Sequence, residues 1–156
     1  MTMRPVYLTL DPDDEDTNGF ANDVTAASGA AFTLITDETP DGLAHKVVIT
    51  PSGSVTGNYT ISGFDADGHA VSETLATNTT NPVTSVKFYA TGLVVLAPSG
   101  LGAETVDIGW ADEFASRTIA TERYLQGDRT TVQVIVTGTI GFDVEVTASD
   151  LLQYTS

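Results

Sequence analysis

The residues best suited to chemistry form a short acidic run near the amino terminus. Asp14, Asp16 and Asn18 supply oxygen atoms at alternate positions, and Gly19 takes the sixth position. A calcium loop of the EF-hand type begins in this way, but its twelfth position, here Thr25, requires a bidentate glutamate. We therefore expect a solvated acidic turn, with a looser calcium site on Asp14, Asp16 and Asn18 as the alternative.

The rest of the sequence lacks the spacing of a catalytic or cofactor site. Without cysteine, the chain can form no disulfide, thiolate metal site or thiol nucleophile. His45 and His69 each stand alone in a strand pattern, so we expect structural histidines. Neither a Gly-x-Ser-x-Gly elbow nor a glycine-rich phosphate loop occurs. The sequence predicts no catalytic residue, no cofactor and no enzymatic activity.

The charge of the chain narrows the classes of partner. It has 21 acidic and 6 basic residues, a formal net charge of −15, and the basic residues form no cluster. An acidic surface repels nucleic-acid phosphates and anionic membranes, so we expect neither as a partner. The amino terminus does not read as a signal peptide, and no stretch has the length of a membrane-spanning helix. We expect a soluble protein made in the cytoplasm.

The clearest element is a β-hairpin over residues 58–75. Tyr59 and Ile61 share one face before the turn, and Val71 and Leu75 share one face after it. This period of two is that of a half-buried strand. The turn Asp65-Ala-Asp-Gly68 ends in a glycine, which can adopt a positive φ.

Strand patterns recur along the rest of the chain. They cover residues 5–10, 31–36, 44–50, 83–97 with a break at Gly92, and 105–110 with Val106, Ile108 and Trp110 on one face. Residues 11–19 show no strand period. A second hairpin is predicted from the alternation over 132–136 and 140–146, which puts Asp143 and Glu145 on an outer face.

These patterns predict an all-β fold, an antiparallel sandwich or barrel of about nine to eleven short strands with a carboxy-terminal hairpin. No stretch would make a helix long enough for a βαβ crossover. We divide the chain into a core domain over 1–110, a linker over 111–130, and the hairpin over 131–156, packed on the same domain.

Several segments, taken in order, resemble a family of small bacteriophage virion proteins. They include the opening Arg4-Pro-Val-Tyr-Leu-Thr-Leu-Asp-Pro12, then Thr17-Asn-Gly19, Asp41-Gly-Leu-Ala-His-Lys-Val-Val-Ile-Thr50, the hairpin over 59–75, Val83-Thr-Ser-Val-Lys-Phe88, Val106-Asp-Ile-Gly-Trp110, and the tail over 131–147 with Asp150. The match covers most of the chain, and the order of the segments carries it, because each segment alone is a common β-hairpin pattern.

The resemblance implies a virion component without enzymatic activity. We expect a capsid decoration, or cement, protein that binds the exterior of the head shell and stabilises it. Its partners would be the major capsid protein and copies of itself, expected as a trimer. The alternatives are a head–tail neck or tail component, and a carbohydrate- or receptor-binding β-sandwich module.

Contacts between subunits are expected at two kinds of place. Unpaired edge strands and loops of the sandwich can bridge neighbours. Apolar segments near the chain ends can be buried in an oligomer, or can pack on the domain's own core. The residues of these segments are Val6, Tyr7, Leu8, Leu151, Leu152 and Tyr154.

Overall fold

The computed structural model describes residues 7–77, 81–122, 129–132, 135–136 and 144–147. All regular elements in this part are strands. They are β1 (Tyr7–Leu10), β2 (Asp16–Val24), β3 (Ala44–Pro51), β4 (Asn58–Phe64), β5 (Ala70–Ala76), β6 (Val83–Tyr89), β7 (Thr91–Leu96), β8 (Val106–Ala115), β9 (Ile119–Glu122), β10 (Arg129–Val132), β11 (Ile135–Val136) and β12 (Val144–Thr147).

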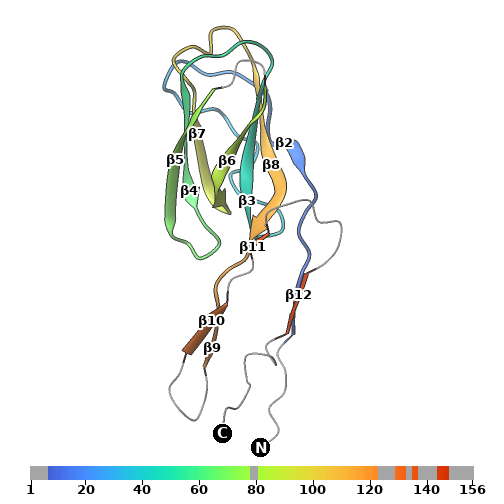
Figure 1. The fold of residues 1–156 in the computed structure, drawn as a ribbon. Coiled ribbons are helices and arrows are strands. Elements are labelled where there is room, and N and C mark those ends of the chain that lie inside the picture. The colour runs from blue at the N-terminus through green and yellow to red at the C-terminus, as the bar shows by residue number, and fades with distance from the viewer. Residues whose placement is uncertain (1–6, 78–80, 123–128, 133–134, 137–143, 148–156) are drawn as a thin grey trace, which may run out of the picture.

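Seven strands, β2 to β8, build two antiparallel sheets that face each other (Figure 1). The larger sheet has the order β6-β3-β8, with β2 and the short β11 both pairing with β8. The smaller sheet has the order β5-β4-β7. The all-β antiparallel sandwich is confirmed, but it contains fewer strands than the nine to eleven expected.

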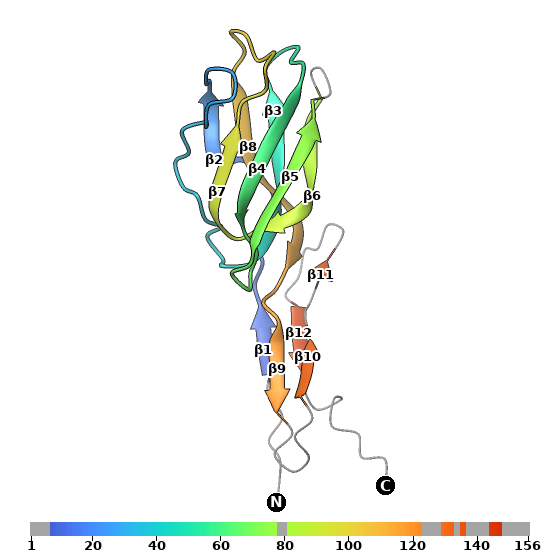
Figure 2. The same cartoon turned by 90° about the vertical axis from the view of Figure 1, so that its left-hand side faces the viewer.

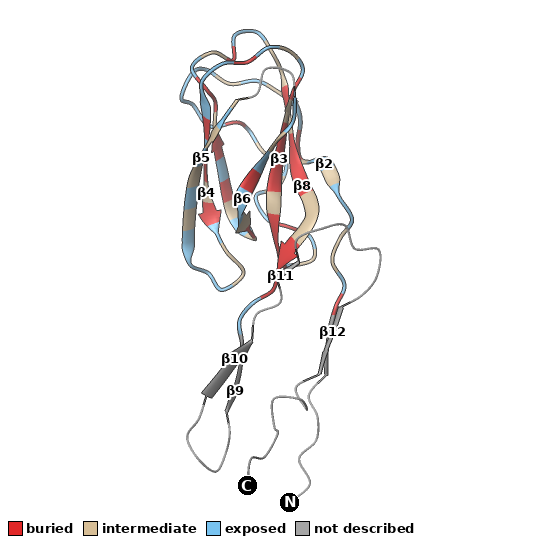
Figure 3. Cartoon of the chain, in the orientation of Figure 1, coloured by how far each residue is buried: buried red, intermediate tan, exposed pale blue. Residues whose placement is uncertain are grey.

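The core lies between the two sheets, where Figure 3 shows the buried segments of the strands. Val106, Ile108 and Trp110 of β8 are buried, as their alternation predicted. They face Tyr59 and Ile61 of β4, which are both fully buried, within one continuous apolar cluster. The period of two therefore identified the inward side of both central strands correctly.

The predicted hairpin over 58–75 forms as β4 and β5, in continuous register from Asn58 opposite Ala76 to Phe64 opposite Ala70. Gly68 in its turn has a φ of 80°, which only glycine adopts readily. The predicted break near Gly92 is also present: β6 ends at Tyr89, β7 begins at Thr91, and Gly92 has a φ of 63°.

Strand β2 was not expected, because residues 11–19 show no period of two. Its pairing with β8 is irregular, with shifts of register between Asp16 and Ala21 and between Ala21 and Val24. Such bulges add residues to one strand and so destroy the alternation in sequence. Gly109 of β8 permits this close pairing, since a Cβ at Gly109 would overlap the backbone of residues 16–18.

The strand predicted over 31–36 was wrong, since only Ala31 forms an isolated bridge, to Leu96. The segment runs along the edge of β7 instead. The N–H groups of Gly29 and Phe32 donate to the carbonyls of Ala97 and Val95, both at 2.9 Å. Ile35 N–H donates to the Phe20 carbonyl in β2 at 2.8 Å. Residues 29–35 therefore link β7 to β2 and close one side of the sandwich.

Residues 111–115, expected to begin a linker, continue β8, and Phe114 and Ala115 are buried. Farther along, much of the predicted carboxy-terminal hairpin, including residues 133–134 and 137–143, lies outside the described residues. β10 pairs with β9, β11 with β8, and β12 with β1. Alternation fixes the faces of a strand but not its partner, so a sequence pattern cannot distinguish these pairings. The predicted turn of that hairpin lies outside the described residues.

Two short antiparallel ribbons, β1–β12 and β9–β10, extend beyond the same end of the sandwich (Figures 1 and 2). We call this end of the molecule the ribbon end.

Candidate functional site

Several polar contacts between distant parts of the chain lie at the ribbon end. The acidic segment 11–15, which connects β1 to β2, is held there at three points. Asp13 N–H donates to Asp41 Oδ2 at 3.0 Å, and Glu15 N–H donates to Asp112 Oδ1 at 2.6 Å. Trp110 Nε1 donates to the Asp14 carbonyl at 3.0 Å. The acidic segment is thereby fixed to β8 and to the loop before β3.

His45, the first residue after Ala44 in β3, lies at the centre of these contacts. Its side chain is 1% exposed, and Nε2 lies 2.8 Å from Asp41 Oδ2, a carboxylate that is 5% exposed. Its Nδ1 lies 2.8 Å from the Ala111 carbonyl of β8. His45 was expected to stand alone, but it bridges the loop before β3 to β8. The i, i+4 spacing of Asp41 and His45 was the signal that the sequence analysis missed.

The pKa values of this group reflect the pairing. Burial by itself would lower the pKa of His45, but the bonds to Asp41 and to the Ala111 carbonyl outweigh burial and raise it. Burial would likewise raise the pKa of Asp41, but the bonds from His45 and from two backbone N–H groups leave it below its ordinary value. Burial and the neighbouring Asp41 charge raise the pKa of Asp13.

The turn between β4 and β5 is hydrogen-bonded to the segment that connects β8 to β9. Thr118 donates to the Asp67 carboxylate twice, from its N–H at 2.6 Å and from Oγ1 at 2.5 Å. These bonds lower the pKa of Asp67. Asp65 Oδ1 accepts the N–H groups of Asp67 and His69, both at 2.9 Å, which orders the turn. His69 is exposed, as expected of a structural surface histidine.

A second cluster closes the other side of the sandwich, between β5 and β6. The Glu73 carboxylate of β5 accepts the N–H groups of Val86 and Lys87 at 3.0 and 3.1 Å, and the Tyr89 hydroxyl at 3.0 Å. Lys87 Nζ donates to the Ser72 carbonyl at 2.6 Å. With residues 29–35 on the opposite side, both flanks of the sandwich are bridged. That edge strands and loops bridge neighbours stays a prediction, because in the described part β5 and β6 each pair with a single strand.

The residues of the alternative calcium site, Asp14, Asp16 and Asn18, make other contacts. Asp16 Oδ1 accepts the Asn18 N–H at 3.1 Å, and the Asn18 side chain donates to Asn22 Oδ1 at 3.3 Å. Asp14 offers its carbonyl to Trp110. In the described part of the chain, no three His, Cys, Asp or Glu residues are grouped so as to hold a metal ion.

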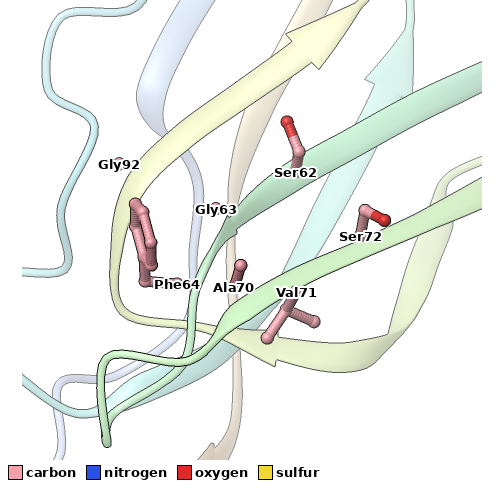
Figure 4. Close-up of a pocket in the computed structure, with 7 residues that line it drawn as sticks. All are labelled: Ser62, Gly63, Phe64, Ala70, Val71, Ser72 and Gly92. Atoms are coloured by element: carbon pink, nitrogen blue, oxygen red, sulfur yellow. The ribbon is translucent and has the colours of Figure 1, made fainter.

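A hollow in the smaller sheet is lined by Ser62, Gly63, Phe64, Ala70, Val71, Ser72 and Gly92 (Figure 4). Its lining contains no ionisable group. Phe64 is exposed beside Gly92, where an added Cβ would meet the Phe64 ring. The hollow therefore offers apolar and hydroxyl groups but neither an acid nor a base for catalysis.

The predicted contact residues near the chain ends lie mostly beyond the described part. Val6, Leu151, Leu152 and Tyr154 are outside it, and only the backbone of Tyr7 and Leu8 is described. In β1, Tyr7 pairs with Thr147 and Leu8 with Val146 of β12. The structure thus joins a segment near the amino terminus to one near the carboxy terminus within one ribbon.

Comparisons of the chain with known protein families, with curated proteins and with solved structures find no match. Among the described residues, no helix meets the length and hydropathy that crossing a membrane requires.

Proposed function

We propose that this protein is a non-enzymatic structural component of a bacteriophage virion, namely a decoration protein that binds the outside of the head shell as an oligomer. The order of the segments that resemble small virion proteins supports the placement in a virion. The observation that carries the proposal is the pair of ribbons at one end of a closed sandwich, because ribbons of this kind need further contacts to be stable.

A two-stranded antiparallel ribbon is at best marginally stable by itself in water. Within the described residues, β1, β12, β9 and β10 each pair with one neighbour only, so each ribbon keeps two unpaired edges. Further strands from other copies can complete such edges by strand addition. A trimer that gathers its ribbons around one axis supplies these strands and leaves the sandwiches outside.

The polar groups of the sandwich favour an architectural role over a catalytic one. The buried side chains of His45 and Asp41 form hydrogen bonds with backbone groups and with each other. Glu73 and Asp67 are likewise occupied by backbone N–H groups and neighbouring hydroxyls. Carboxylates used in this way fix the shape of the domain, which is what a component of a shell requires.

The first test is the copy number of this chain in purified particles, measured by quantitative mass spectrometry. A decoration protein is expected in a fixed small-integer ratio to the major capsid protein, and heads that lack it should release their genome at a lower temperature. A few copies per particle would instead indicate a neck or tail component. Absence from the particle would overturn the proposal.

The second test addresses oligomerisation through the ribbons. The register pairs Leu8 with Val146 and Thr9 with Glu145, so neighbouring positions of β1 have partners of opposite character. Leu8→Lys should dissociate the oligomer in sedimentation velocity. Thr9→Lys, the matched control, places a cation opposite Glu145 and should leave the oligomer intact. Equal behaviour of the two variants would contradict assembly through this ribbon.

A further inference from the structure

We infer that His45 is a buried cation that, through Asp41, holds the acidic segment 11–15 against the sandwich. We call the contacts of His45 with Asp41 and of Asp41 with Asp13 the clasp, and we infer that it opens as the pH rises. The clasp is a property of the fold and does not depend on the role of the protein in a virion. It rests on the geometry of both nitrogens of the His45 ring.

Both ring nitrogens of His45 face groups that only accept hydrogen bonds. The Ala111 carbonyl lies 2.8 Å from Nδ1, and Asp41 Oδ2 lies 2.8 Å from Nε2. A backbone carbonyl has no proton to donate, and neither has an ionised carboxylate. A neutral imidazole carries a single N–H, so one contact would then join two acceptors. The imidazolium satisfies both contacts at once.

The charges around His45 also favour a cation. Asp41 contacts it directly, and the Asp13 carboxylate acts on it from the acidic segment. From β8 it receives the Ala111 carbonyl and the Phe114 ring, whose centroid lies 6.1 Å away. Tyr89 is its register partner in β6, and the Tyr89 hydroxyl is bound to Glu73.

Two other described cations near the ribbon end, Lys46 and Arg117, lie near other carboxylates, and Arg117 acts on Asp67. Lys46 pairs with Glu113 at 2.8 Å, and so does not offset the acidic segment. The segment brings Asp11, Asp13, Asp14 and Glu15 against Asp41 and Asp112. Protonated His45 contacts Asp41 directly, and Asp41 in turn accepts the N–H of Asp13 in the acidic segment. When His45 loses its proton, Asp41 keeps a buried charge without a counter-ion, and its repulsion of the acidic segment is no longer offset.

The direction of the pH effect follows from the folded-state pKa of His45, which is raised. Its stabilising contribution is complete below the ordinary histidine pKa of about 6.5 and disappears as the pH rises through the higher folded value. Because the acidic segment connects β1 to β2, opening of the clasp loosens the connection between the β1–β12 ribbon and the sandwich.

The test follows the wild-type protein by NMR from about pH 6 to about pH 9, a range that spans the titration of histidine. Both His45 ring nitrogens should carry a proton at the lower pH. Amide protection of Asp13 and Glu15, corrected for intrinsic exchange, should fall by about tenfold across the His45 titration, whereas that of Ile61 in the core should not change. A singly protonated ring at the lower pH, or unchanged protection of Asp13 and Glu15, would overturn the inference.

The chain supplies a matched control in His69, which follows Asp65 at the same spacing but has a side chain that is 77% exposed. His69→Gln should leave the protection of Asp13 and Glu15 as in the wild type. His45→Gln should lower that protection at every pH and remove its pH dependence. If His45→Gln does not fold, the wild-type titration by itself decides the matter.

Discussion

At the scale of single residues, the described carboxylates act mainly on the backbone of their own chain. Asp41 accepts the N–H groups of Asp13 and Leu43, and Asp67 accepts that of Thr118. Such bonds satisfy backbone donors where no ladder does, which lets strands end and loops attach without orphaned groups. Not every buried polar group is satisfied in this way: the buried hydroxyl of Tyr59 has no hydrogen-bond partner among the described residues.

Tyr59 and Tyr89 make a matched pair of buried tyrosines. Burial raises the pKa of Tyr59 to about 12, and no acceptor compensates its hydroxyl, so Tyr59→Phe should be neutral or stabilise by up to about 1 kcal/mol. Tyr89→Phe loses the bond to Glu73 and should destabilise by about 1–2 kcal/mol. Urea unfolding followed by circular dichroism measures both. A loss in Tyr59→Phe as large as that in Tyr89→Phe would show that the Tyr59 hydroxyl has a partner.

At the scale of elements, the two flanks of the sandwich are closed by different means. Residues 29–35 run beside β7 as an irregular segment that also bonds to β2. Between β5 and β6, a single carboxylate, that of Glu73, takes the place of a strand ladder. Edges bonded in this way are less open to pairing with other chains. In the described part, β5 and β6 still pair with only one strand each, as do the strands of the ribbons.

Glu73→Ala should separate β5 from β6. The change leaves the N–H groups of Val86 and Lys87 and the Tyr89 hydroxyl without their acceptor, and we expect a loss of about 2–3 kcal/mol. Thr74→Ala, one residue along the same strand and exposed, should change stability by less than about 0.5 kcal/mol. Amide exchange in β6 should rise in Glu73→Ala alone, and similar effects of both variants would contradict this role of Glu73.

At the scale of the whole molecule, shape and charge act together. A closed sandwich carries its ribbons at one end (Figure 2), and the chain has a formal net charge of −15. Charge of one sign keeps copies apart in solution and weakens any contact that brings them together. Self-association should therefore depend on how far the charges are screened.

Salt should strengthen association between copies. Raising the ionic strength from about 0.01 M to about 1 M shortens the Debye length from about 30 Å to about 3 Å, so repulsion between like-charged copies falls. Sedimentation velocity at several protein concentrations should show a dissociation constant lower by about tenfold or more at the higher salt. Weaker association in salt would mean that ion pairs between copies, rather than apolar and backbone contacts, hold the oligomer together.

Local geometry allowed much of the fold to be predicted from the sequence. Side chains in a strand alternate regardless of its partner, so alternation identified β4, β5 and the first part of β8 and the buried side of Tyr59, Ile61 and Ile108. The turn before Gly68 was equally clear, since the need for a positive φ is a property of one residue.

What joins these elements was decided by the tertiary structure. Bulged β2 has no period to detect, and alternation does not tell which partners the ribbon strands take. The ribbon end depends on contacts such as Glu15 with Asp112, which are 97 residues apart, and His45 with Ala111, which are 66 apart. Such contacts form only once packing has brought the two segments together, and no local pattern in the sequence encodes the distance between them.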